Sequence, residues 1–97
     1  MPEFSQPFGG VRLDKKMNKE ELIRAIRFLV AAEYEAVQMY TQLAESIDDK
    51  LAQKVLLDVA NEEKVHAGEF LQLLIILSPE EEKFYQEGYK EVQEKMD

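Results

Sequence analysis

Apolar residues recur every three to four positions in two long segments, the spacing of helices that bury one face. The first stripe contains Leu22, Ile26, Leu29, Glu33, Ala36, Tyr40, Leu43 and Ile47. The second contains Ala52, Leu56, Val59, Glu63, His66, Phe70, Leu73 and Leu77. Both stripes predict helices that bury these positions against partner helices. Three ionisable residues, Glu33, Glu63 and His66, therefore fall where core residues are expected.

Local signals set the ends of the two long helices. Asn18 followed by Glu21 resembles an N-cap with a carboxylate at the third position. The first helix then continues to about Ile47 without Pro or Gly. Asp48-Asp49 predicts the cap of a second helix that continues to Leu77.

The two ends of the chain differ from this middle part. Residues 1–17 contain two prolines and two glycines and are predicted to form an irregular N-terminal arm, leaving 18–97 as the helical domain. Ser78 followed by Pro79 and three glutamates predicts the capped start of a third helix, which continues to about Met96. Its apolar stripe is thin and consists of Tyr85, Tyr89, Val92 and Met96.

The short connection at Asp48 makes the two long helices an antiparallel hairpin. Glu33 lies fifteen residues before Asp48 and Glu63 lies fifteen residues after it. At ~1.5 Å per residue both glutamates are about 22 Å from the turn, so they can face each other across the hairpin. His66 lies about one turn further along the second helix.

These three residues suit a metal ion. Unpaired ionisable groups in a core cost several kcal/mol, and neither stripe contains a Lys or Arg partner. His66 alone is more simply a satisfied core histidine, but a Glu-x-x-His pair level with a second glutamate favours a ligand role. Carboxylates with imidazole suit iron or manganese, and zinc can occupy such a site.

One chain supplies only half of a di-iron bundle, which needs a Glu from each of two helices and Glu-x-x-His from each of two others. Two chains related by a two-fold axis complete it as a four-helix bundle. Residues 70–77 are apolar on nearly every side, which predicts an assembly larger than this dimer.

Composition narrows the function classes. The net charge of −8 has the wrong sign for a nucleic-acid binder. With no cysteine, disulfides and thiolate chemistry are excluded. No segment has the length of a membrane span or the pattern of a secretory signal, so the expected location is the cytoplasm or a compartment filled from it.

Two segments, Ala32–Tyr40 (AEYEAVQMY) and Asn61–Ala67 (NEEKVHA), resemble the encapsulated ferritins of the ferritin/rubrerythrin-like group. The resemblance implies a half-ferritin hairpin that dimerises and assembles into a decameric ring inside an encapsulin nanocompartment. It also implies that Glu33, Glu63 and His66 bind iron and that Tyr40 hydrogen-bonds beside them. Members of this family have carboxylates along an ion uptake route, and Glu35 matches one of them. Ala32 replaces a second acid that members can have there, and Met39 replaces a tryptophan that some members have.

The favoured function is a ferroxidase that oxidises Fe(II) with dioxygen or peroxide for storage in the nanocompartment. One alternative is a rubrerythrin-like di-iron peroxidase, although the cysteine-ligated iron that such enzymes usually contain is excluded here. Another is a metal-stabilised structural assembly without turnover. Glu35 and Glu62 are weaker candidates for a secondary metal site, and their simplest interpretation is a solvated or interfacial surface.

Overall fold

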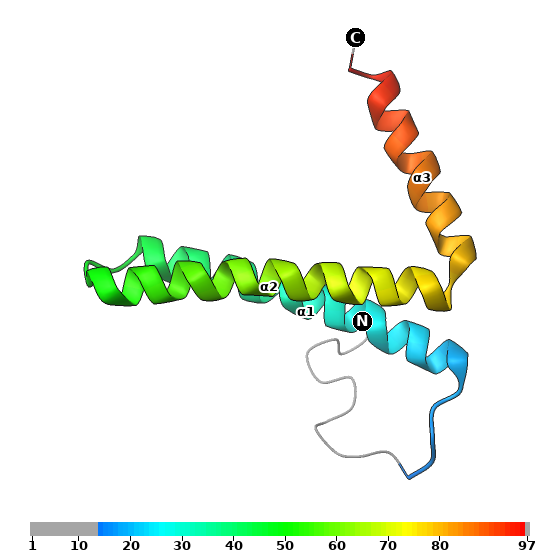
Figure 1. Cartoon of the computed structure of the whole chain (residues 1–97), viewed down its shortest axis with the longest axis horizontal. Helices are drawn as coiled ribbons and strands as arrows, with labels where there is room; N and C mark the ends of the chain where they lie inside the picture. The colour runs from blue at the N-terminus through cyan, green and yellow to red at the C-terminus, as the bar shows by residue number, and fades with distance from the viewer. Residues whose placement is uncertain (1–13, 97) are drawn as a thin grey trace, which may run out of the picture.

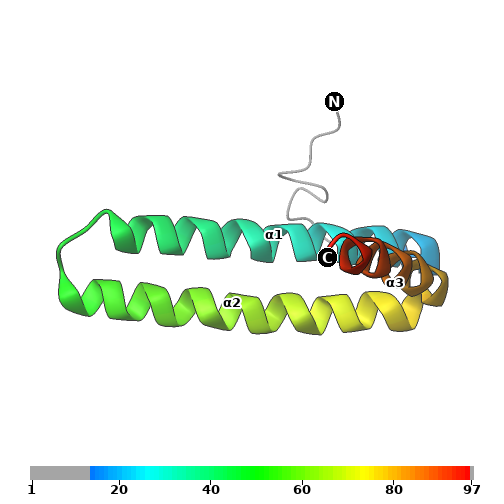
Figure 2. The same ribbon diagram turned by 90° about the horizontal axis from the view of Figure 1, so that it is seen from above.

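The computed structural model describes residues 14–96, which form three α-helices: α1 (Lys19–Glu45), α2 (Lys50–Leu77) and α3 (Pro79–Glu94). α1 and α2 lie side by side as an antiparallel hairpin, and α3 leaves the end of α2 at a steep angle (Figures 1 and 2). The prediction of an all-α fold with a hairpin and a short third helix is confirmed. The predicted arm, 1–17, lies outside the described residues except for 14–17, which precede α1.

Side chains cap the two long helices as predicted. The Asn18 side chain accepts a hydrogen bond from the Glu21 amide at 2.8 Å, and the Asn18 amide donates to the Glu21 carboxylate at 3.0 Å. Asp49 accepts from the amide of Ala52 at 2.8 Å. These bonds satisfy amides that have no partner within the helix, which fixes the two helix starts.

The predicted side-chain cap at Ser78 is wrong, and two predicted helix ends differ from the observed ones by two residues. α1 ends at Glu45 rather than Ile47, because the chain needs residues 46–49 to reverse direction. Ser78 precedes α3, but its side chain makes no capping hydrogen bond, and the proline at the first position starts the helix. α3 ends at Glu94, two residues before Met96.

A different set of residues from the predicted stripes joins α1 to α2. We call this set the seam. Most of the buried residues in the described part of the chain belong to it, at spacings of seven or fourteen: Ile23, Val30 and Ala44 of α1, and Ala60, Ala67 and Leu74 of α2. Three of the six are alanines, which let two helix backbones approach closely. The sequence pattern predicted burial of the stripes against partner helices, and it did not indicate the seam.

The predicted stripes instead form one side of the hairpin, which we call the open face. Four of its leucines, Leu22, Leu29, Leu43 and Leu73, are 38–48% exposed, and most of its other large apolar residues are half-buried. Ile26 is buried with Ile23 and Leu74 in the core cluster at the end of the hairpin near α3, and Phe70 and Leu77 pack against that cluster, partly buried. The open face thus has the composition of a core and the exposure of a surface within a single chain.

No helix in the described part of the chain is both long and apolar enough to span a membrane.

Candidate metal centre

The open face brings the three predicted ligands together near the middle of the hairpin. Glu33 projects from α1, and Glu63 and His66 project from one side of α2. The Nδ1 atom of His66 lies 3.8 Å from Oε2 of Glu33 and 3.7 Å from Oε1 of Glu63. One potential ligand atom from each residue lies within 4.8 Å of the others. The predicted distances of the three residues from the turn, along their helices, therefore agree with this geometry.

The two carboxylates are shielded from water more than the histidine is. The Glu33 and Glu63 side chains are 16% and 20% exposed, whereas that of His66 is 47% exposed. Oε2 of Glu33 is buried and accepts no hydrogen bond from any described residue. A buried carboxylate oxygen without a donor carries a desolvation penalty of about 1–3 kcal/mol or more. This oxygen lies close to the potential ligand atoms of Glu63 and His66. A cation bound between the three residues would satisfy it.

The neighbouring carboxylate of Glu63 affects the acidity of Glu33. The pKa of Glu33 is raised, first because its protonated form hydrogen-bonds Glu63, and then because of burial and the negative charge of Glu63. His66 opposes the rise in pKa. Two like charges at close range favour holding either a proton or a cation between them. The site is thus built to take up positive charge.

The donor set fits a first-row metal ion better than it fits an ion pair. Two carboxylates and one neutral imidazole are hard or borderline ligands of the kind that bind iron, manganese or zinc. Three donors leave the coordination sphere of such an ion incomplete. The exposed side of His66 and the open face around it are where further ligands from outside the chain could approach.

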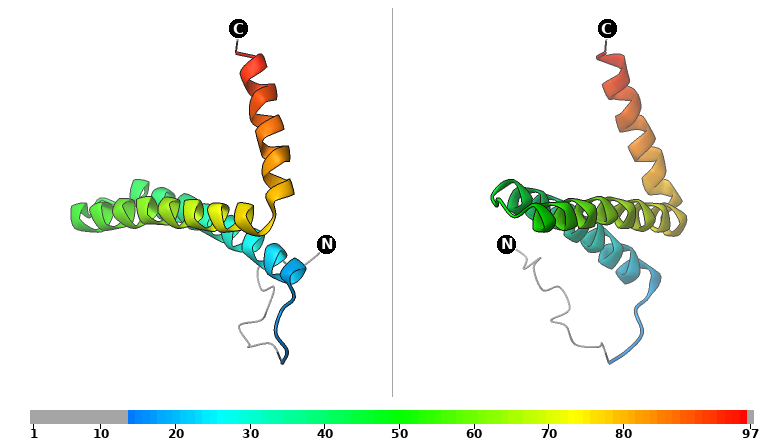
Figure 3. Two further views of the ribbon diagram at one scale, coloured as in Figure 1. Left: turned by 45° about the vertical axis from the view of Figure 1, so that its right-hand side comes forward. Right: turned by 60° about the vertical axis from the view of Figure 1, so that its left-hand side comes forward.

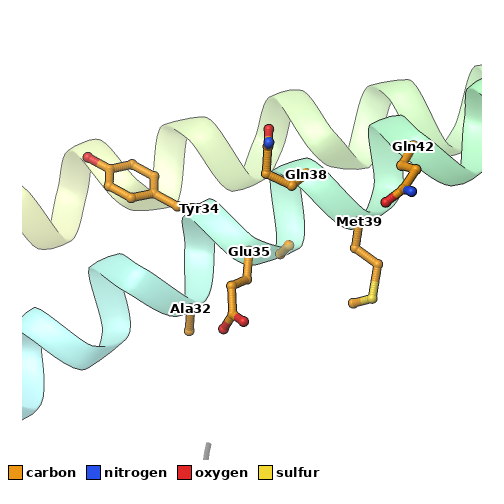
Figure 4. Close-up of a pocket in the computed structure, with 7 residues that line it drawn as sticks. Ala32, Tyr34, Glu35, Gln38, Met39 and Gln42 are labelled. Carbon is orange, nitrogen blue, oxygen red and sulfur yellow. The ribbon is translucent and has the colours of Figure 1, made fainter. Parts of the chain in front are cut away.

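The remaining predicted site residues do not join this cluster. Tyr40 follows Glu33 by one heptad on the open face and is half-buried, and within residues 14–96 its hydroxyl group has no hydrogen-bond partner. Glu35 points away from α2, on the same side of α1 as Ala32 and Met39 (Figure 4). These three residues line a shallow pocket on the outer surface of α1. Glu62 is exposed on α2 and also stands outside the cluster.

Sequence reasoning missed one polar cluster that the fold creates. Arg27 of α1 pairs with Glu81 of α3, 54 residues away, and Tyr85 donates a hydrogen bond to the same glutamate. Only the Glu81–Tyr85 spacing of four residues was visible in the sequence. The contact with Arg27 depends on the angle at which α3 leaves the hairpin, which no local pattern specifies.

Known proteins share both the sequence pattern and this architecture. Residues 22–97 match the rubrerythrin family. The crystal structure of an encapsulated ferritin domain from Pyrococcus furiosus superposes with a TM-score of 0.83 at 41% sequence identity, covering 90% of this chain and 89% of that one.

Two curated relatives are longer than this chain. A ferritin-like–encapsulin shell fusion protein of Pyrococcus furiosus is 43% identical over 84 residues, which are 87% of this chain and 24% of the relative. The encapsulin nanocompartment cargo protein EncC of Myxococcus xanthus is 35% identical over 81 residues, 84% of this chain and 61% of the relative. The chain thus spans about a quarter of the first relative and about three fifths of the second.

The fold and the donor set are those of the ferritin-like class of helical proteins. Within that class the chain belongs to the rubrerythrin family, as one of its encapsulated ferritins.

Proposed function

We propose that two copies of this chain form a di-iron ferroxidase centre that oxidises Fe(II) to Fe(III). The observation that supports this proposal most strongly is the unpaired oxygen of Glu33 beside Glu63 and His66. The three residues supply half of the ligands that a carboxylate-bridged di-iron bundle requires. A second copy of the chain, related by a two-fold axis through the open face, would supply the other half of the ligands. The same copy would cover the exposed leucines.

Each residue has a distinct role in this proposal. Glu33 and Glu63 provide the anionic oxygens, which stabilise Fe(III) more than Fe(II) and so favour oxidation. Nδ1 of His66 faces the carboxylates and serves as the neutral nitrogen ligand. Tyr40 is proposed to donate a hydrogen bond to a ligand carboxylate once the partner chain is present. Iron is the substrate, and its transfer of electrons to dioxygen or peroxide is the redox chemistry of the metal itself.

We further propose that the dimers associate into a larger ring, expected to be a decamer, and that the ring acts inside an encapsulin shell. The names of the two curated relatives, one a shell fusion and the other a nanocompartment cargo protein, support the shell as a partner. The exposed apolar residues of α3 and of the two residues after it support an assembly beyond the dimer, since Tyr89, Val92 and Met96 are 59–77% exposed. Glu35 and Glu62 remain candidates for secondary cation contacts along the surface.

Aerobic addition of Fe(II) to the purified chain tests the proposal. We expect rapid formation of the Fe(III) absorbance in the native protein, and only the uncatalysed rate in Glu33→Ala, Glu63→Ala and His66→Ala. Glu45→Ala is the matched control, because Glu45 is an exposed glutamate of the same helix as Glu33. Oxidation by His66→Ala at the native rate would show that the site is elsewhere.

Native mass spectrometry tests whether the centre lies between chains. One histidine per chain cannot provide two imidazole ligands, so metal should appear in even-numbered oligomers. A monomer that holds two iron ions at full occupancy would contradict the interchain centre.

The same assays separate the alternatives. A di-iron peroxidase would oxidise Fe(II) much faster with peroxide than with dioxygen, and would turn over repeatedly with an electron-donor protein. A metal-stabilised structural assembly would bind iron and associate, yet Fe(II) would be oxidised only at the uncatalysed rate.

A further inference from the structure

α3 is connected to α2 by a very short joint. α2 ends at Leu77 and α3 begins at Pro79, with Ser78 between them. Pro79 has no amide hydrogen to continue the helical hydrogen bonds, so the chain can turn here. α3 then projects away from the hairpin (Figures 1 and 3). A one-residue joint does not by itself select this direction among others.

Three side chains cross this joint, and we call them the elbow cluster: Arg27, Glu81 and Tyr85. Arg27 donates from Nε to Oε2 of Glu81 at 3.1 Å and from Nη2 to Oε1 at 2.5 Å. This two-pronged contact fixes both the distance and the orientation of the two groups. The hydroxyl of Tyr85 donates to Oε2 of Glu81 from the next turn of α3. The cluster therefore ties the first turns of α3 to α1, although α3 is connected only to α2.

The ring of Tyr85 gives the cluster an apolar side. It packs against the buried core of Ile23, Ile26 and Leu74 at this end of the hairpin. The remaining apolar residues of the predicted third stripe are exposed, Tyr89 and Val92 on α3 and Met96 just after its end. Contact between α3 and the hairpin core is thus made through the start of the helix, and the rest of α3 is held by its own rigidity.

The cluster is charged and bonded at neutral pH. The Arg27 guanidinium lowers the pKa of Glu81, whose side chain is only 13% exposed. Burial raises the pKa of Tyr85 to about 12, so this hydroxyl keeps the proton it donates. Half of the Arg27 side chain is in solvent, at 48% exposure, which makes the contact accessible to competing ions.

Exposed apolar surfaces on both sides of the joint would favour a different arrangement of α3. Leu73 and Ile76, near the end of α2, are 40% and 63% exposed, and the outer part of α3 has its own exposed apolar stripe. Without a restraint, burial of these surfaces against each other would favour α3 positions closer to the hairpin. We infer that the elbow cluster is a conformational device that fixes the direction of α3 and keeps its apolar stripe away from its own hairpin. This inference is independent of the iron chemistry.

Distance measurements between paired spin labels test the inference on the full chain. The protein has no cysteine, so Asp58→Cys on α2 and Gln93→Cys near the end of α3 place two labels at exposed positions without background. Labelled chains are diluted in excess unlabelled chains, so that only distances within one chain are measured. We expect a single narrow distance distribution in the parent chain and a broadened or shortened one in Glu81→Gln and in Arg27→Gln.

Two control comparisons distinguish the effect of breaking the elbow cluster from a general effect of changing the charge. Glu80→Gln removes the same charge one residue earlier in the first turn of α3, where the side chain is exposed, and should leave the distribution narrow. Arg27→Glu combined with Glu81→Arg should narrow the distribution again, with circular dichroism confirming that every variant retains its helices. A Glu81→Gln distribution identical to that of Glu80→Gln would overturn the inference, as would a double variant no narrower than the two single ones.

Discussion

The two apolar surfaces of the hairpin differ in the size and the exposure of their residues. The seam joins α1 to α2 within the chain and is built largely from Ala44, Ala60 and Ala67, each 3–4% exposed. The open face has leucines where the seam has alanines, and four of those leucines are left 38–48% exposed. Only the open face contains ionisable residues at core-type positions, Glu33, Glu63 and His66.

Under the proposed dimerisation, this difference separates the residues that fold the chain from those that assemble it. Small residues are enough to bring two antiparallel helices into contact, since close packing depends on fit rather than on side-chain size. The larger residues remain available for a partner, and the candidate metal ligands lie among them. The site is therefore incomplete for the same reason that the open face is exposed.

Leu74→Ala is expected to have the largest effect on the fold. Leu74 is 2% exposed and connects the seam to the core cluster with Ile23 and Ile26. Truncation of such a leucine costs about 2–5 kcal/mol, because burial is lost and a cavity remains. We expect urea denaturation of the metal-free chain to show a loss of about 3 kcal/mol. A loss below about 1 kcal/mol would indicate that the seam contributes little to holding the hairpin together.

Leu29→Ala is expected to weaken association more than folding. Leu29 is 41% exposed on the open face, so close to half of its apolar surface remains to be buried by a partner. At about 2 kcal/mol for a fully buried leucine, two copies per dimer lose about 1.5 kcal/mol, roughly tenfold in the dissociation constant. Sedimentation equilibrium with a divalent metal measures this change.

Leu51→Ala is the matched control for Leu29→Ala, because Leu51 is 72% exposed and lies outside the open face. Equal effects of the two substitutions on association would place the dimer interface elsewhere.

The helices and the position of the candidate site along the hairpin were predictable, because both depend on local spacing in the sequence. Caps at Asn18 and Asp49 define where two helices start, and the rise per residue then places Glu33 opposite Glu63. The seam was not predicted, because alanines at seven-residue intervals give a weak apolar signal beside a stripe of leucines. Binary patterning shows which residues are apolar, but it does not show whether they face their own chain or another.

The remaining polar contacts could not be predicted for a related reason. The contact between Arg27 and Glu81 requires the direction of α3, and this direction depends on a tertiary contact rather than on a periodic pattern. The expected hydrogen bond of Tyr40 depends on a second chain. The part of the candidate site that lies within one hairpin was therefore accessible from the sequence, and the part between chains stays a prediction.

Glu33→Gln is expected to stabilise the metal-free chain while removing an iron ligand. The folded-state pKa of Glu33 is raised, so its ionised form disfavours folding at pH values above that pKa. An uncharged amide removes this penalty, and we expect a gain of about 1 kcal/mol at pH 7, the size typical of relieving one unpaired buried group. Below the ordinary pKa of the carboxyl group both states are protonated, so the gain should disappear.

Paired urea titrations at neutral and acid pH check the sign of this effect. A loss of stability in Glu33→Gln at neutral pH would show that the charge of Glu33 already has a partner within the chain. Aerobic iron oxidation by the same variant should fall to the uncatalysed rate, so stability and function move in opposite directions at this residue of the open face.

Gly68→Ala is expected to have the smallest effect, at a position that belongs to neither surface. Gly68 follows His66 by two residues, is exposed within α2, and an added Cβ atom there meets nothing within 4 Å. Glycine inside a helix costs about 1 kcal/mol relative to alanine, because its backbone loses more freedom on folding. We expect a gain of about 0.5–1 kcal/mol, seen as an increase of a few degrees in the melting temperature of the metal-free chain. Iron oxidation should be unchanged, since the ligands lie on another side of α2. A normal melting temperature combined with a smaller assembly would instead mean that a neighbouring chain approaches the backbone at Gly68, and would add a third contact surface to the seam and the open face.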